Sequence, residues 1–168
     1  IFLLIVLQGI IGWFMVQSGL VTNTSVSHYR LSIHLSTAII IISSIYWLIL
    51  NALSKQNKIF FSFSNQNSPF QILILLILLQ IIIGAFVSGL DAGKIYNSWP
   101  LMGNSYFPND NNLKNIFSLS AFSDPSLVQF IHRNLAYVIG FFYILIFVKI
   151  YKNKMYDLYK SVNLLGYL

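Results

Sequence analysis

The chain has 168 residues, of which 57% are hydrophobic and 8% are charged, and its mean hydropathy is +0.72. This composition excludes a water-soluble enzyme. Ten Lys and Arg residues outweigh four Asp residues, which gives a formal net charge of +6. The charges fall in short clusters between apolar runs, so they describe membrane topology and not a nucleic-acid surface. Cysteine is absent, which excludes disulfides, thiolate metal sites and cysteine nucleophiles.

Four apolar runs predict an all-α integral membrane protein with four transmembrane helices. A helix needs about 20 apolar residues to cross the hydrocarbon layer. The runs at 1–17, 31–50, 70–90 and 127–150 reach or approach that length. Because apolar runs stand at both ends of the chain, we expect it to be the middle of a longer protein.

Lysine-bearing loops orient the predicted spans. The chain divides into a first pair of spans, an inner loop, a second pair of spans and a further inner segment, at 1–50, 51–69, 70–150 and 151–168. The two inner segments are rich in Lys, so they are expected to face the cytoplasm or matrix. The loop 91–126 carries three Asp residues and is placed outside. Its length and prolines favour a lid over a simple turn.

The two pairs of spans look like copies of one another. The segment QGIIGWFMVQSGL (8–20) resembles QIIIGAFVSGLDAG (80–93), and the glutamine and the glycine four positions after it align. After each segment and an outside loop comes a span with a histidine near its start, His34 or His132. The glutamine and glycine register has a simple explanation, namely close helix packing with glutamine as an interhelical hydrogen-bond donor. The repeat nevertheless predicts equivalent places for the two histidines.

These histidines are the candidate ligands. A titratable side chain within a span usually faces a bundle interior and has a partner. His34 and His132 are predicted at one depth, roughly 5 to 8 Å below the outer surface. Imidazoles without cysteines or clustered carboxylates suit haem iron better than zinc or a di-iron centre. The alternative is a structural histidine that is hydrogen-bonded to a neighbouring helix or to interfacial water, and the residues leave both open.

Two arginines accompany the histidines. Arg30 precedes His34 by four positions, hence on the same helical face, and Arg133 directly follows His132. An arginine fork at the outer end of the bundle could hold the paired carboxylates of haem propionates. The alternative for both is contact with lipid headgroups. His28, in the outside turn, is predicted to be a surface residue.

The chain resembles the haem A synthase family over almost its whole length. Four segments carry the resemblance in the right order: GWFMVQSGL (12–20), VSHYRLSIHL (26–35), AFVSGLDAGKIYNSWPLM (85–102) and VQFIHRNLAY (128–137). The most specific stretch is GLDAGKIYNSWPLM. The absence of cysteines resembles the proteobacterial and mitochondrial subgroup.

The resemblance implies a duplicated pair of four-helix bundles, of which this chain holds the third to sixth of eight spans. It implies that His34 is one iron ligand of the amino-terminal site, where the substrate haem O binds. It implies that His132 is one iron ligand of the carboxy-terminal site, which holds a haem b cofactor. The partner histidines and a glutamate implicated in catalysis would lie on the other spans, so no catalytic residue is assigned here.

The implied reaction is oxidation of the C8 methyl of haem O to a formyl group, which makes haem A for cytochrome oxidase. The implied location is a bacterial plasma membrane or a mitochondrial inner membrane. Haem O and the bilayer are the implied partners, with haem O synthase, an electron donor and a second copy left open. Residues 1–168 alone are expected to be inactive. The alternatives are a b-type cytochrome electron carrier and an assembly or scaffold protein without a cofactor.

Overall fold

The computed structural model describes residues 1–19, 25–53 and 68–154. These ranges form four α-helices: α1 (Phe2–Val16), α2 (His28–Leu53), α3 (Ser68–Gly89) and α4 (Pro125–Lys152). The loop between α3 and α4 adds three short 3₁₀ helices: η1 (Ala92–Lys94), η2 (Leu113–Phe117) and η3 (Leu119–Ser123). The described part of the chain is therefore all-helical, as predicted.

Three of the four helices are long and apolar enough to cross a membrane, namely α2, α3 and α4. The described part of α1 is a shorter apolar helix of 15 residues. The composition and these helices make the chain an integral membrane protein. Of the lysines predicted on the inner side, Lys149, Lys152 and Lys154 lie at or just beyond the end of α4. The others, Lys55, Lys58 and Lys160, lie outside the described residues. The orientation of the spans and the division of the chain stay predictions.

Helices α2 and α4 begin earlier than their apolar runs. The Asp124 side chain caps α4 by accepting a hydrogen bond from the Leu127 backbone N–H at 3.0 Å, and Pro125 occupies the first turn. Both features are typical of a helix start, because the first backbone N–H groups have no partner within the helix. The apolar runs mark the membrane-embedded part of each helix, and the helices extend beyond it.

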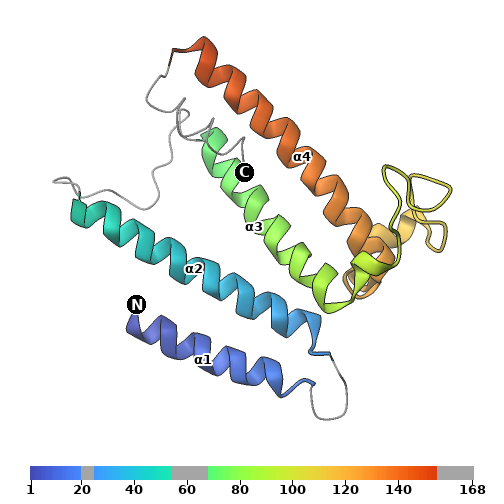
Figure 1. Cartoon of the computed structure of the whole chain (residues 1–168), viewed down its shortest axis with the longest axis horizontal. Helices are drawn as coiled ribbons and strands as arrows, with labels where there is room; N and C mark the ends of the chain where they lie inside the picture. Colours follow the sequence, from blue (N-terminus) through green and yellow to red (C-terminus); the bar gives the residue numbers. More distant parts are fainter. Residues whose placement is uncertain (20–24, 54–67, 155–168) are drawn as a thin grey trace.

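The helices pack in chain order, α1 on α2, α2 on α3 and α3 on α4. Figure 1 shows α1 and α2 side by side, α3 and α4 side by side, and the described part of the loop after α3 at one end of the second pair. The end of α1 and the start of α2 lie towards that same end. In the described part of the chain, α1 lies beside α2 and α3 lies beside α4, and α2 also packs on α3.

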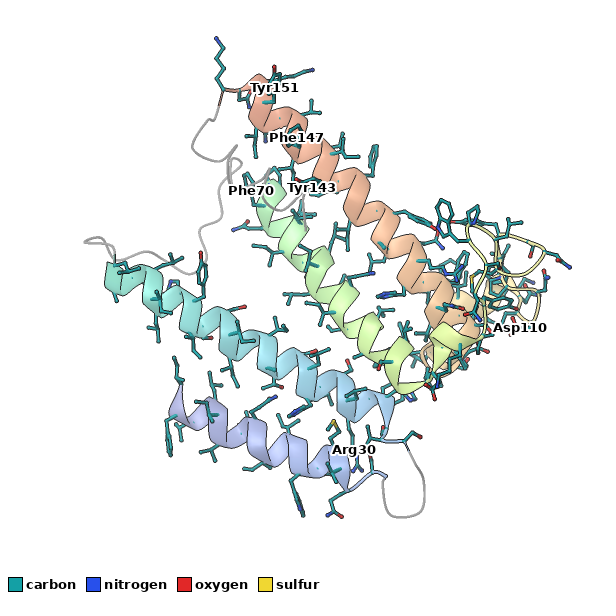
Figure 2. The ribbon with its side chains drawn as sticks, in the orientation of Figure 1. Arg30, Phe70, Asp110, Tyr143, Phe147 and Tyr151 are labelled. Carbon is teal, nitrogen blue, oxygen red and sulfur yellow. The ribbon has the colours of Figure 1, made fainter. Side chains whose placement is uncertain are left out.

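Two clusters of side chains hold α3 against α4. The cluster near the loop contains Ile83 and Phe86 from α3 and Val128 from α4. The other cluster is built on Ile146 and Ile150 of α4, and its further members include Phe70, Tyr143 and Phe147. Figure 2 shows these three aromatic residues at the end of the pair away from the loop. The second pair is thus packed along its whole length.

The two pairs meet where α2 begins and α3 ends. A Cβ atom added to Gly89 would lie 2.7 Å from His28 Cβ and 2.8 Å from His28 Cα, so the backbones approach closely there. The His28 ring lies against Phe86, with ring centroids 5.6 Å apart, and its Nε2 atom is buried. The prediction that His28 is a surface residue is therefore wrong. The reason is that α2 starts at His28 itself, which places the residue against α3.

Candidate functional site

In the first helix pair, His34 of α2 is held by Gln8 of α1. The Gln8 amide nitrogen donates to the His34 backbone oxygen at 3.0 Å and lies 3.5 Å from His34 Nε2. One turn along α1, Gly12 faces the same ring, because a Cβ atom there would lie 3.0 Å from His34 Cε1. The imidazole thus lies between a glutamine and a glycine of the neighbouring helix.

The second pair repeats this arrangement with its own residues. The Gln80 amide nitrogen of α3 lies 3.2 Å from His132 Nε2 on α4 and donates to the His132 backbone oxygen at 3.3 Å. A Cβ atom on Gly84 would lie 3.2 Å from His132 Cε1. The glutamine and the glycine are four positions apart in both pairs, which puts them on one face of the helix.

This geometry confirms that the two histidines occupy equivalent places. His34 is the seventh residue of α2 and His132 is the eighth residue of α4. At 1.5 Å per residue, they lie roughly 9 and 10 Å from the helix starts. Because both helices begin before their apolar runs, the depth of the histidines below the outer surface stays a prediction. The interhelical role expected for the glutamines is also confirmed.

Both sites leave buried polar atoms without a partner. Among the described residues, no hydrogen-bond partner is found for the Nδ1 atoms of His34 and His132 or for the Oε1 atoms of Gln8 and Gln80. Buried polar groups are nearly always satisfied, so such atoms indicate a bound group or water. One neutral imidazole per site is also what a haem takes from a single helix. The donor set of each site, one imidazole, therefore fits a haem, and the unpartnered Nδ1 and Oε1 atoms are places for water or another polar group. The described ranges contain no cluster of three or more His, Asp or Glu residues that could hold a bare metal ion.

Arg30 is tied to α1. Its Nη1 atom donates to the Phe14 backbone oxygen at 2.7 Å, and its guanidinium carbon lies 3.7 Å above the centre of the Phe14 ring. Figure 2 shows Arg30 near the end of the first pair where α2 begins. Because a guanidinium has five N–H donors, a single hydrogen bond leaves others for a further acceptor. The role of Arg30 in binding a propionate stays a prediction.

Arg133 has a different environment. Its Nη2 atom donates to the Tyr96 backbone oxygen at 2.6 Å and its Nη1 atom to the Ser98 backbone oxygen at 2.9 Å. Arg133 of α4 is thus hydrogen-bonded to the loop between α3 and α4. The repeat does not extend to the arginines, because Arg30 precedes its histidine by one turn and contacts a helix, whereas Arg133 follows its histidine and contacts a loop.

The loop between α3 and α4 is folded onto the first half of α4. Trp99 Nε1 donates to the Tyr137 hydroxyl at 2.6 Å, and the Tyr106 hydroxyl donates to Asn134 Oδ1 at 2.5 Å. Loop and helix together line a small hollow, formed by Pro100, Met102, Tyr106, Phe130, Arg133, Asn134 and Tyr137. The loop is therefore more than a turn, in line with the sequence.

Asp110 connects the loop with the start of α4. It accepts hydrogen bonds from the Tyr96 hydroxyl at 2.9 Å and from the Ser126 hydroxyl at 2.5 Å. Partial burial raises the pKa of Asp110, whereas its hydrogen bonds lower that pKa. The lowering effects together are larger, so the pKa of Asp110 lies below its ordinary value. The pKa of Tyr96 is raised, mainly by partial burial and secondly by its hydrogen bond to Asp110.

This shift predicts a loop that loosens in acid. A carboxyl whose pKa is depressed by folding contributes stability above its unfolded pKa, and that stability is lost as the pH falls through the folded pKa. We expect proteolysis of the loop to speed up below about pH 4. The Asp110→Asn variant should lose most of that pH dependence. A loop whose cleavage rate rises equally in the variant and the wild type would contradict the role of Asp110.

Residues 1–167 match the model of the COX15-CtaA family, described as cytochrome oxidase assembly protein. A "Heme A synthase" of Pelagibacter ubique is 50% identical over 159 residues, which are 94% of this chain and 46% of that protein. Proteins of the same name from a Wolbachia of Brugia malayi and from Rickettsia prowazekii are 42% and 41% identical, over 80% and 78% of this chain.

The chain spans less than half the length of these relatives, since it covers 46%, 40% and 39% of them. No solved structure matches the chain. The family match extends over residues 1–167, which include both helix pairs and both histidine sites. The chain therefore belongs to the COX15-CtaA family of cytochrome oxidase assembly proteins.

Proposed function

We propose that this chain is the central part of a haem A synthase, an oxidoreductase that converts the C8 methyl of haem O to a formyl group. The observation that carries the proposal is the pair of equivalent His, Gln and Gly sites, one in each helix pair. The relatives named "Heme A synthase" support it. The bacterial sources of these relatives favour a bacterial plasma membrane.

The two histidines are assigned one haem each. His34 supplies one iron ligand for the substrate haem O, and His132 supplies one for a haem b cofactor. A haem bound at His132 would supply the electron-transfer chemistry that side chains lack. The protein itself holds each imidazole against a glycine of the neighbouring helix, which fixes the ring before the porphyrin arrives.

The arginines are assigned to the propionates. Arg30 uses one N–H group and Arg133 uses two in the hydrogen bonds described above. A guanidinium has five N–H donors, so each residue keeps some for a carboxylate. Arg30 precedes His34 by four positions and Arg133 follows His132 directly, so each arginine is within one helical turn of its histidine along the chain. Haem O synthase, an electron donor and a second copy of the protein are further proposed partners.

The test uses the gene completed at both ends and expressed in a membrane that contains haem O. The wild type should yield haem A on extraction and chromatography. The His34→Ala variant should lower haem A formation at least about tenfold, because loss of even a supporting partner costs that much at metal sites. The His132→Ala variant should lose bound haem b, seen in the reduced-minus-oxidised spectrum.

The matched control is His28→Ala, since this histidine lies on α2 six positions before His34 and contacts α3. This variant should keep both haems. Haem b without any haem A in the wild type would instead identify an electron-carrying cytochrome. A colourless wild-type protein after haem supplementation would point to an assembly or scaffold protein.

A further inference from the structure

We propose that Gln8 and Gln80 are positioning residues, each of which sets the ring tautomer of its histidine and keeps Nε2 as the nitrogen that can bind iron. The proposal rests on the proposed function for the identity of the iron-bearing group. Its structural part concerns only this chain's own side chains. The two glutamines occupy equivalent places in the two helix pairs, so the same device occurs twice.

The hydrogen bonds settle which end of each amide is the nitrogen. A backbone carbonyl oxygen can only accept, so the amide atom 3.0 Å from the His34 oxygen and the one 3.3 Å from the His132 oxygen must be donors. An amide flipped by 180° would place two oxygens against each other. The amide nitrogen therefore also faces the imidazole.

The nitrogen then determines the tautomer of the ring. It carries two hydrogens, of which one is directed to the backbone oxygen and the other towards Nε2 of the same histidine, 3.5 Å away in the first pair and 3.2 Å in the second. An N–H group next to Nε2 requires a lone pair there, so the proton of the neutral ring sits on Nδ1. A metal also binds imidazole through a lone pair. The glutamine thus preselects Nε2 as the ligand atom.

The amide nitrogen lies next to the Nε2 lone pair, so an iron bound at Nε2 would require the amide to turn away from the ring. On the other side, Gly12 or Gly84 limits the movement of the ring, because Cε1 lies 3.0 or 3.2 Å from the place of a Cβ atom. Two residues of one helix therefore fix the imidazole of the next.

The contact between glutamine, glycine and histidine is the same in both helix pairs, although the neighbouring segments differ. The connection from Gly12 to His34 spans 22 positions, whereas that from Gly84 to His132 spans 48. The arginines also differ in position and partner between the two pairs. The glutamine, glycine and histidine remain in contact in both. This favours a specific role of the glutamine in positioning the histidine over a role in general helix packing.

The experiment compares the full-length wild type with Gln80→Met, which keeps the length of the side chain and removes its amide. In the haem-free protein, nitrogen NMR should show His132 with its proton on Nδ1 in the wild type and a mixture of both tautomers in the variant. In the haem-loaded protein, we expect about a twofold or larger loss of haem b affinity, because only rings with a lone pair on Nε2 can bind iron. The reduced haem should also bind carbon monoxide more readily, because the histidine dissociates more often.

The matched control is Gln71→Met, on the same helix nine positions earlier, where about 13 Å of helix separates it from Gln80. It should match the wild type in both measurements. Gln8→Met should reproduce the tautomer change at His34, which keeps the test valid if Gln80→Met does not fold. An unchanged tautomer in both glutamine variants would overturn the proposal. A wild type without haem but with the expected tautomers would count against the proposed function alone.

Discussion

The Gly84→Val substitution is expected to lower haem binding by the second helix pair about fivefold to more than a hundredfold in the full-length protein. A Cβ atom at this position would lie 3.2 Å from His132 Cε1 and 3.8 Å from Nδ1. Valine adds two more carbons and has essentially one side-chain rotamer in a helix. The ring must therefore leave its place against α3. Overpacking of this kind costs about 1 to 3 kcal/mol, which is about fivefold to more than a hundredfold in binding.

Gly140→Val is the matched control. It makes the same change in α4 of the same pair, but a Cβ atom there meets nothing within 4 Å. Both variants carry the same change in helix propensity, so the difference between them isolates contact with the histidine. Haem content and the reduced-minus-oxidised spectrum are the measurements. In the first pair, Gly12→Val and Gly9→Val form the corresponding comparison. Equal haem content in Gly84→Val and Gly140→Val would contradict the assigned place of His132.

The helix pairs could be predicted from the sequence because membrane helices are selected by length and apolarity alone. The ends of the helices could not be predicted from apolarity, since they depend on local hydrogen bonds. Asp124 and Pro125 form a recognisable helix start, and these two residues could have placed the beginning of α4. The start of α2 at His28 lies against Gly89, which is more than sixty positions away in the sequence, and apolarity does not reveal such a contact.

The candidate site could be predicted in part. Aligning the repeat located His34 and His132 as equivalent residues, because duplication preserves register. It did not reveal that each glutamine contacts a histidine, since that depends on how far one helix is shifted along the next. The hydrogen-bond partners of Arg133 could not be predicted from the sequence either. Its hydrogen bonds go to backbone oxygens of Tyr96 and Ser98, and no side-chain pattern in the sequence points to a backbone acceptor.

The Gly89→Ala substitution is expected to destabilise the protein by about 2 kcal/mol, although the same change usually stabilises a helix. The reason is the close approach between the two helix pairs. A Cβ atom on residue 89 would lie 2.7 Å from His28 Cβ and 2.8 Å from His28 Cα. Because Cα belongs to the backbone, a change of side-chain rotamer cannot relieve the contact. The start of α2 must move away from the end of α3.

This movement should also disturb the contacts around the joint. Tyr29 lies against Phe86 with ring centroids 5.4 Å apart, and its hydroxyl is 2.8 Å from Ser123 Oγ. The measurement is thermal unfolding of the full-length protein in detergent, in which Gly89→Ala should unfold several degrees below the wild type. Gly93→Ala is the matched control, since a Cβ atom there meets nothing within 4 Å. A Gly89→Ala variant at least as stable as Gly93→Ala would show that the two pairs are not joined closely at this point.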